Sequence, residues 1–463
     1  MLQHVCIRVE LSNIRSCNIP SPRTDEITSR ICTDGIDPSA SSASHTEHSP
    51  AHLEHYSLHD SSCADYYPDQ ERWPLQVVVV GGGIMGLSTA WGLRRLGCRV
   101  TVLEQNQVPN PLGSSGDQHR LIRYAYGAEL GYTRLIRPAY AAWDLLWQTL
   151  GVSHHHPTGT LVMAKDDLLW AEASMKTLAQ AGHSVERMSP TQLKAAYPHL
   201  QTDDLELSYY LPSGGILMAE NIVTDLAKKL RLTGTEILEH ARVVEVNPAR
   251  NTVALEDGTR MQADLVVVAA GPWTSRLLPS LKADVTPSRQ VVLYMKPPPQ
   301  MQAAWQHSPM MLDIGGGGGV YAVPPRAGAG LKVGDHSFSL SGDPDENRIP
   351  RAQEVQDLFD ACRSRLKDLD QYTIDHAKTC FYTVEPQERF IVKQVEGVWV
   401  MTGFSGHGFK FGALMGLLTA RAAMGSISPS DMRKLAAGQV VNTNDLAMLT
   451  DPCLDQTSGG LSL

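Results

Sequence analysis

Three observations along the chain predict an α/β fold with two parts. A β-branched run at residues 76–80 leads into a glycine-rich turn at 81–86, followed by a helical pattern up to Leu96. A second short strand, residues 99–103, ends at Glu104. From residue 290 to about 336, β-like stretches alternate with glycine turns, which is typical of hairpins. The sequence therefore predicts a Rossmann-type domain and a second α+β domain built on a mostly antiparallel sheet.

Composition and charge describe a globular chain and exclude several function classes. The 463 residues are 42% hydrophobic and 19% charged, enough apolar material for about two to three domains. The net charge of −9 disfavours nucleic acid and anionic membranes as partners, because both need a concentrated basic surface. The longest apolar runs, such as residues 265–271, are far shorter than the roughly 18 residues of a membrane span. We expect neither a nucleic-acid nor a membrane partner.

Cysteine usage favours a reducing, cytoplasmic location. No two cysteines form a Cys-x-x-Cys pair, so neither a zinc ribbon nor a thioredoxin-like redox site is predicted. Residues 1–17 lack an apolar signal core and carry Glu10, which disfavours secretory and transit peptides. The cysteines are Cys6, Cys17, Cys32, Cys63, Cys98, Cys362, Cys380 and Cys453.

Residues 1–72 differ from the rest of the chain and are predicted to be a disordered extension. The stretch 39–65 is rich in Ser and His and has no sustained period, so it cannot bury enough apolar surface to offset its ordering entropy. Its histidines are interpreted as part of a solvated tail, because no second shell for a metal is predictable. The run His154-His155-His156 is interpreted as a polar surface loop, because no Cys or carboxylate stands at ligand spacing. No metal site is predicted.

The remaining elements and domain boundaries follow from periodicity. Helices are expected at 133–150, 221–232 and 412–424, and strands at 158–164, 241–246, 263–269 and 398–401. The glycines at 315–319 lack the Gly-Lys-Ser/Thr ending of a phosphate loop and are expected to connect a hairpin. The first domain is assigned to residues 73–150, 215–285 and 375–430, the second to 151–214 and 286–374, and a C-terminal tail to 431–463.

The glycine turn has the spacing of a dinucleotide cradle. Gly81 allows a tight turn, Gly83 allows the backbone to approach a pyrophosphate, and Gly86 lets the helix pack on the strand. Ile84 and Met85 begin that helix, whose N-terminal N–H groups face the phosphates. Glu104 is placed to bind an adenosine ribose and would repel the 2′-phosphate of NADP. The motif alone leaves FAD and NAD open.

Two later segments favour FAD. Residues 263–271, followed by Pro-Trp, are typical of the closing strand in flavoproteins of the two-dinucleotide-binding-domain type. Residues 403–410 form a glycine-rich turn before a helix, which suits the N1–C2=O edge of a reduced flavin. The flavin contacts expected from these segments and from the strand at 241–246 are Val243, Ala270, Gly271, Trp273, Gly406, His407, Gly408 and Lys410.

Four segments in order, residues 113–127, 330–336, 380–383 and 403–411, together resemble the monomeric sarcosine oxidase family. Its relatives include N-methyltryptophan oxidase and pipecolate oxidase, within the D-amino-acid oxidase superfamily. The resemblance covers residues 75–430, and Gly-Phe-Ser-Gly-His-Gly-Phe-Lys-Phe at 403–411 is its most specific part. It implies an FAD-dependent oxidase of N-substituted or cyclic secondary amino acids, such as sarcosine. The substrate would be oxidised to an imine that hydrolyses, and O2 would return as H2O2.

The resemblance also implies residue roles. Arg123 and Lys410 match the pair that holds the substrate carboxylate, for which a planar fork and a point charge are suited. Lys332 matches the lysine that activates oxygen. Tyr321, His336 and Tyr382 match pocket residues, with His336 expected to titrate in the range that tunes amine protonation. The substrate amine would lie over the re face of the flavin.

Cys380 matches the cysteine that joins the flavin 8α-methyl group in a thioether, so covalent attachment is expected. The chain departs from the family between residues 115 and 120. Aligned on Arg120, which is expected to contact the flavin, a histidine of the best-known members becomes Gly116 and a threonine becomes His119. This exchange predicts a wider pocket.

Three alternatives are distinguished by particular residues. A flavin dehydrogenase that passes electrons to a carrier is disfavoured by Lys332, and a flavin-holding subunit without turnover is disfavoured by Arg123 and Lys410. A nicotinamide-dependent dehydrogenase would have no use for the turn at 403–411. We expect a monomer acting on a small amino acid with a free carboxylate.

Overall fold

The computed structural model describes residues 74–315, 319–346 and 348–439. The predicted extension at 1–72, with its histidines, residues 316–318 of the glycine run and residues 440–463 of the predicted tail lie outside the described residues.

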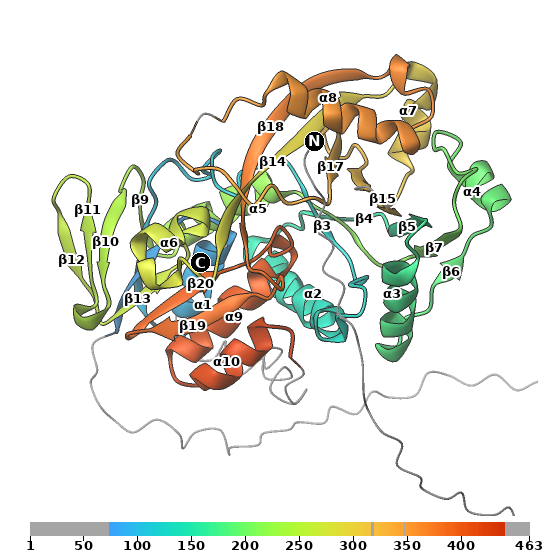
Figure 1. Ribbon diagram of the computed structural model, residues 1–463. Helices are drawn as coiled ribbons and strands as arrows, with labels where there is room; N and C mark the ends of the chain where they lie inside the picture. The colour runs from blue at the N-terminus through green and yellow to red at the C-terminus, as the bar shows by residue number, and fades with distance from the viewer. Residues whose placement is uncertain (1–73, 316–318, 347, 440–463) are drawn as a thin grey trace, which may run out of the picture. The chain divides into compact units, whose positions relative to one another are not determined.

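A six-stranded sheet contains the strands on either side of the glycine turn (Figure 1). The central valine-rich strand β1 is buried on both faces, as expected of a strand in a parallel sheet. It pairs in parallel with β2 and β13, and β19 alone among these six strands runs antiparallel to its neighbour. In sheet order the strands are β19 (Ile391–Val395), β20 (Val398–Thr402), β13 (Leu265–Val268), β1 (Gln76–Val80), β2 (Arg99–Leu103) and β9 (Glu236–Leu238).

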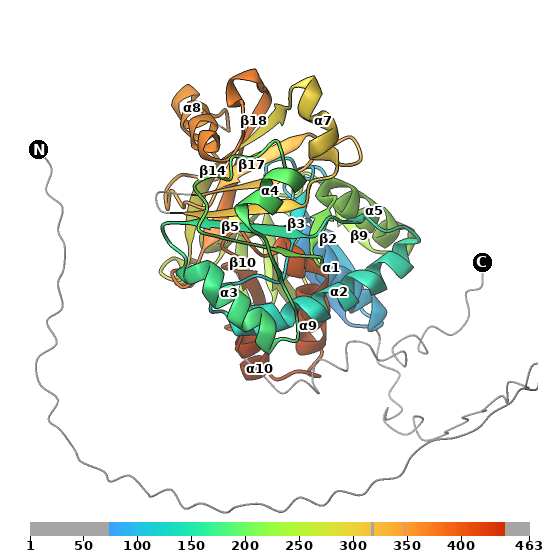
Figure 2. The ribbon, with the colours of Figure 1, turned by 90° about the vertical axis from the view of Figure 1, so that its right-hand side faces the viewer.

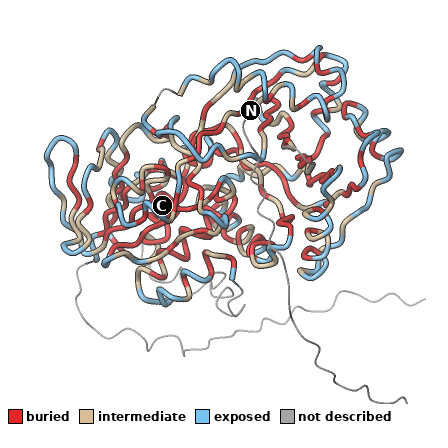
Figure 3. The backbone as a smooth tube through the Cα atoms, in the orientation of Figure 1, coloured by how far each residue is buried: buried red, intermediate tan, exposed pale blue. Residues whose placement is uncertain are grey.

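The valines of β1 alternate between two cores. Val77 and Val79 pack with residues of the helices α1, α2, α5 and α9. Val78 and Val80 pack against a small sheet of β10 (Val243–Asn247), β11 (Thr252–Leu255) and β12 (Arg260–Gln262). Buried residues accordingly follow the sheets and the inner helices, and exposed residues follow the outer loops (Figure 3). The helices are α1 (Ile84–Arg95), α2 (Leu130–Leu150), α3 (Leu169–Gln180), α4 (Pro190–Ala196), α5 (Ala219–Leu232), α6 (Thr274–Leu277), α7 (Pro299–Gln306), α8 (Ala352–Ala361), α9 (Gly412–Ala423) and α10 (Pro429–Ala436).

A second, eight-stranded sheet is mostly antiparallel. Its neighbouring strands pair antiparallel except for β15 and β5, and the long strands β14 and β18 run side by side (Figure 1). In sheet order the strands are β18 (Thr373–Val384), β14 (Thr286–Lys296), β17 (Leu331–Asp335), β16 (Val320–Val323), β15 (Met310–Gly315), β5 (Thr160–Lys165), β7 (Leu207–Leu211) and β6 (Glu186–Arg187). Two three-stranded sheets comprise β10 (Val243–Asn247), β11 (Thr252–Leu255) and β12 (Arg260–Gln262), and β3 (Arg120–Ile122), β8 (Gly215–Leu217) and β4 (His155–Pro157).

The eight-stranded sheet has one face under helices and one face free for a cavity. Leu331 and Val333 of β17 pack into a core that includes residues of α7 and α8, which lie near β14 and β18 in Figure 2. Because side chains alternate along a strand, Lys332 points to the opposite face. The alternation of side chains along each strand therefore decides which residues face the helices and which face the opposite side of the sheet.

The predicted fold class is confirmed: a Rossmann-type parallel sheet accompanies a second, mostly antiparallel sheet. The domain boundaries stay predictions. β18 belongs to the eight-stranded sheet although residues 375–430 were assigned to the first domain, and α10 lies at the start of the predicted tail and packs on β19. Among the described helices, none has the length and apolar character needed to cross a bilayer.

The close contact of α1 and α9 yields a test. A Cβ on Gly416 would lie 2.4 Å from the backbone carbon of Ser88, so the helices approach through this glycine. We expect Gly416→Ala to destabilise the protein by about 1–3 kcal/mol in chemical denaturation, because the helices must separate. Helix propensity alone predicts the opposite sign, a gain of about 1 kcal/mol, so a more stable variant would contradict the packing argument.

Candidate active site

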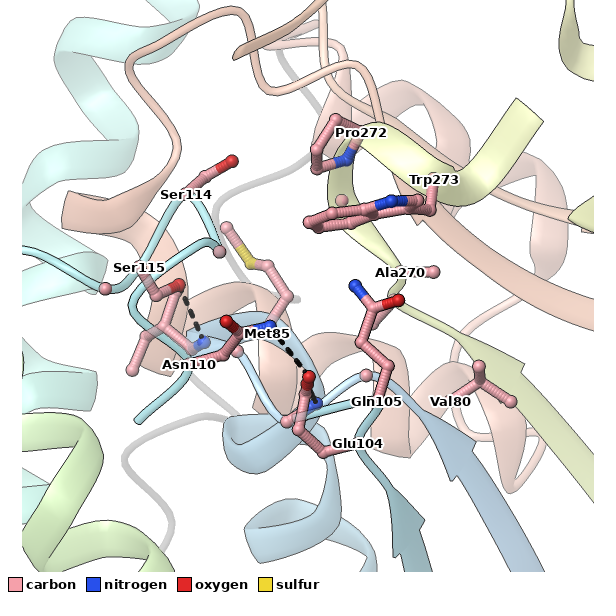
Figure 4. Close-up of a pocket in the computed structure, with 18 of the residues that line it drawn as sticks. Val80, Met85, Glu104, Gln105, Asn110, Ser114, Ser115, Ala270, Pro272 and Trp273 are labelled. Carbon is pink, nitrogen blue, oxygen red and sulfur yellow. Dashed lines mark hydrogen bonds between the residues drawn. The ribbon is translucent and has the colours of Figure 1, made fainter. Parts of the chain in front are cut away.

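A cavity of about 340 Å³ lies where the carboxyl ends of β1, β2 and β13 meet (Figure 4). This is the edge at which parallel α/β sheets bind ligands. Twelve of the predicted cofactor residues line it: Gly81, Gly83, Ile84, Met85, Glu104, Arg120, Val243, Ala270, Gly271, Trp273, Gly406 and Gly408.

The glycine turn has the close contacts that its spacing predicts. Gly81 has a φ of +113°, and a Cβ there would lie 2.4 Å from the Ala269 oxygen. Gly86 does not line the cavity; instead, its Cβ would lie 1.9 Å from the Gly81 oxygen, so it lets α1 pack against the turn. Only glycine fits at these positions.

Glu104 is buried at the end of β2 and ties three segments together. Its Oε2 accepts a hydrogen bond from the Gly82 amide at 2.7 Å. Its Oε1 accepts from the Asn106 amide at 3.1 Å and from Asn110 Nδ2 at 2.8 Å. Burial raises the pKa of this carboxyl, although the three donors act in the opposite direction.

Ser115 and Asn110 are cavity residues that the sequence interpretation did not single out. Ser115 Oγ accepts a hydrogen bond from the Ile84 amide at 3.0 Å and so occupies one donor at the start of α1. Figure 4 shows Ser114 and Ser115 across the cavity from Pro272 and Trp273. The sequence signal available for Ser115 was its position directly before Gly116 and Asp117.

A second cavity, of about 640 Å³, adjoins the first. Arg120, Tyr382, Gly406 and Phe409 line both, so an elongated ligand can pass from one to the other. All six predicted catalytic and substrate residues line the second cavity, together with Cys380 and His407: Arg123, Tyr321, Lys332, His336, Tyr382 and Lys410.

Arg123 and Lys410 are cations without a carboxylate partner within 4 Å among the described residues. Arg123 follows β3 and lies over the rings of Tyr126 and Trp170, while its Nη1 is buried without a hydrogen-bond partner. Lys410 is 5% exposed, and its Nζ donates to the His407 oxygen at 2.9 Å. Burial lowers the pKa of both groups, that of Lys410 well below its usual range. This pair is suited to a buried anion.

Lys332 and Arg120 share a partner. Both pair with the buried carboxylate of Asp117, which also accepts a hydrogen bond from the Tyr294 hydroxyl at 2.5 Å. Burial acts to raise the pKa of Asp117, but Lys332 and Arg120 outweigh it and hold the value well below the usual range. Burial and Arg120 lower the pKa of Lys332 to about 8.

The polar rings near Lys332 are neutral at ordinary pH. Gly334 leaves room for the Tyr321 ring and Gly406 for the Tyr382 ring, since a Cβ at either glycine would lie within 2.6 Å of the tyrosine. Burial raises the pKa of both phenols. Burial and then Arg123 lower the pKa of His336 to about 4, so the expected titration of His336 near neutrality is not supported.

Cys380 lies on β18 and lines the second cavity. Burial raises the pKa of its thiol, while Arg120 and Lys332 act to lower it. The thiol is therefore accessible to a ligand in the cavity but is not strongly acidified.

Comparison with known families shows to which family the chain belongs. Residues 76–422 match the family DAO, described as FAD dependent oxidoreductase. The chain belongs to this family. The predicted family and enzyme class, an FAD-dependent oxidoreductase of the sarcosine oxidase type, are confirmed.

Curated relatives agree with this assignment. The chain is 29% identical over 364 residues to peroxisomal sarcosine oxidase of Homo sapiens, covering 76% of this chain and 93% of that protein. It is 28% identical over 364 residues to N-methyl-L-tryptophan oxidase of Yersinia pestis, covering 77% and 96%.

Solved structures show the same fold. NikD, an amino acid oxidase of nikkomycin biosynthesis, superposes with a TM-score of 0.68 at 20% identity, covering 80% of this chain and 99% of that one. L-proline dehydrogenase from P. horikoshii gives a TM-score of 0.68 at 19% identity, covering 80% and 99%.

The two adjoining cavities fit the FAD cofactor of the DAO family. The start of α1, the close backbone approach at Gly81 and the carboxylate of Glu104 suit the adenosine diphosphate part. The predicted contacts Cys380, His407 and Lys410 line the second cavity, beyond Arg120, where the ring would extend. Within the described residues, no group of three His, Cys, Asp or Glu could hold a metal ion, and His154 instead contacts Asp225 at 2.7 Å.

The departure at residues 115–120 has a structural explanation. A Cβ on Gly116 would lie 1.9 Å from the Asn110 oxygen, so the backbone of residue 110 fills the space that the exchange was expected to open. His119 is fully buried, with Nε2 3.2 Å from the Gly330 oxygen. At Gly116, therefore, the expected wider pocket is not found.

Glu104 provides a test of cofactor binding. We expect Glu104→Gln to weaken FAD binding by about 10- to 100-fold, because a neutral amide accepts poorly from the Gly82 and Asn106 amides and from a ribose. Titration of the apoprotein with FAD, followed by quenching of flavin fluorescence, gives the dissociation constant. Asn110→Ala removes one donor to Glu104 and should have a smaller effect; equal binding by the Glu104 variant and the parent would refute the assignment.

Proposed function

We propose that the protein is an FAD-dependent oxidase of N-substituted or cyclic secondary amino acids, with O2 as the electron acceptor. The observation that carries the proposal is the pair of buried cations, Arg123 and Lys410, which have no carboxylate within 4 Å among the described residues and share a cavity with Lys332. An amino-acid carboxylate supplies the missing anion. The names of the sarcosine and N-methyltryptophan oxidases support this substrate class.

The residues act by binding and by placing charge. Arg123 and Lys410 hold the carboxylate, which fixes the amine and the neighbouring C–H bond within the cavity. FAD, when held in the adjoining cavities, would supply the acceptor for a hydride from that carbon. The nitrogen loses a proton, and water then hydrolyses the imine to an amine and a carbonyl compound. O2 takes two electrons and two protons and becomes H2O2.

Three uncharged polar side chains are among the residues that line the second cavity. Tyr321, Tyr382 and His336 have pKa values that keep them uncharged at pH 7, so they orient the amine by hydrogen bonds and add no charge to it. The neighbouring cations disfavour an ammonium group in the cavity and therefore favour the neutral amine, the form that can give up a hydride.

Two alternatives predict other behaviour. A dehydrogenase would turn over in the assay only with an artificial electron acceptor. A flavin-holding subunit without turnover would have no substrate carboxylate for Arg123 and Lys410 to bind. Lys332 favours oxygen, because a buried cation stabilises a reduced oxygen anion as it forms. The cytoplasmic location and the monomeric state stay predictions from the sequence.

Substitution of Arg123 tests whether this residue binds the substrate carboxylate. We expect Arg123→Met to lower kcat/KM for sarcosine, pipecolate or N-methyltryptophan by about 10²- to 10³-fold, mainly through KM, because the carboxylate loses its planar partner. Peroxide release is the measurement. Arg134→Met, at an exposed position on α2, is the matched control and should retain full activity. A similar loss in both variants, or none in either, would contradict the proposed clamp.

Covalent attachment of the flavin through Cys380 is tested by acid precipitation. If the thioether forms, yellow colour stays in the pellet of the parent protein and moves to the supernatant in Cys380→Ala. Colour in the supernatant of the parent protein would refute the attachment but would leave the oxidase proposal intact. Absence of flavin from both would overturn both.

A further inference from the structure

The ammonium of Lys332 has a fixed and unusual environment. It is 3% exposed on β17, and its Nζ pairs with Asp117 and lies 3.4 Å from the His119 oxygen. No other carboxylate among the described residues lies within 4 Å of it. A buried ammonium requires such a partner, and here one carboxylate provides it.

Asp117 is itself held rigidly. Ser114 Oγ donates to the Phe381 oxygen at 2.6 Å, and Lys378 donates to the Gly116 oxygen, so both ends of the short loop before Asp117 are tied to β18. Tyr294 of β14 stands directly opposite Lys332 in the sheet, and its hydroxyl donates to the other oxygen of Asp117. Two adjacent strands thus bind one carboxylate.

The charges around Lys332 oppose one another. Burial lowers its pKa most, Arg120 lowers it further, and Asp117 raises it, with a result of about 8. The other titratable groups facing it are His119, Tyr294, Tyr321 and Cys380, and burial keeps each of them uncharged near neutrality. Asp117 is therefore the group that offsets Arg120.

We propose that Asp117 is a positioning residue that holds Lys332 in the cavity, paired and cationic, for the reduction of oxygen. The proposal rests on the proposed function only in assigning the ammonium to oxygen. Asp117 does not line either cavity and acts through Lys332. The Tyr294 hydroxyl donates a hydrogen bond to Asp117 and so takes up part of the negative charge of this carboxylate.

The first test measures the ionisation of Lys332 without any reaction of the cofactor. Competitive labelling with acetic anhydride across a pH series, read by peptide mass spectrometry, gives the midpoint at which Lys332 becomes nucleophilic. We expect a midpoint near 8 in the parent protein. Asp117→Asn should lower it by about 1–3 units, because an opposite charge is removed. Labelling of Lys228, exposed on α5, is the internal reference and should not change.

A matched variant should move the midpoint in the other direction. Tyr294→Phe removes a hydrogen bond to Asp117 and leaves more of its charge for Lys332, so the midpoint should rise. This substitution removes a single hydroxyl and keeps the test valid if Asp117→Asn does not fold. A midpoint that is unchanged or lower in Tyr294→Phe, or unchanged in Asp117→Asn, would overturn the proposal.

The second test links the pair to oxygen. In stopped-flow experiments, reoxidation of substrate-reduced Asp117→Asn by O2 at pH 8 should be slower by about 5- to 50-fold for a shift of one to two units, and its pH profile should move to lower pH. Anaerobic reduction by substrate should change less. Equal losses in both half-reactions would indicate a merely structural role. A parent enzyme inert to O2 would refute the proposed oxidase, while the labelling midpoints would still test Asp117.

Discussion

Burying a cation is costly unless an anion accompanies it, and four cationic side chains border the second cavity: Arg120, Arg123, Lys332 and Lys410. Asp117 compensates two of them. The other two have no carboxylate within 4 Å among the described residues; Glu388, which also lines the cavity, acts to raise the pKa of Arg123, and a bound anion would complete the compensation. The division separates the cavity into a part that the protein has already neutralised and a part that still attracts an anion. Substrate carboxylate and oxygen chemistry can thereby occupy neighbouring places without competing for one charge.

The local parts of the fold were predictable from the sequence. The valine run, the glycine turn and Glu104 are contiguous or nearly so, and each is dictated by the same geometry wherever a parallel sheet approaches a pyrophosphate. The predicted helices and strands begin within a few residues of those observed, as for α2, which begins at Leu130 and was expected from residue 133. The cavity residues Lys332, Tyr321 and Cys380 could be chosen only by resemblance, since no local pattern brings those three strands together.

Contacts between distant segments account for what sequence reasoning missed. Asp117 and Lys332 are 215 positions apart, and Tyr294 and Asp117 are 177 apart. The register that places Tyr294 opposite Lys332 depends on how β14 and β17 pair, and no periodicity within either strand encodes it. Burial also explains why the pKa of His336 differs from the expected value. Removing water from around the imidazole disfavours its protonated form, and Arg123 lowers the pKa further.

The two large sheets alternate along the chain. Strands of the six-stranded sheet come from residues 76–103, 236–268 and 391–402, and strands of the eight-stranded sheet come from 160–211 and 286–384. No single cut separates one sheet from the other, so a single crossover would divide at least one of the two sheets. Substitutions at cavity-facing positions can alter the substrate pocket and leave the interleaved order of the strands unchanged. The interleaving thus ties the evolution of the substrate pocket to the integrity of the nucleotide-binding sheet.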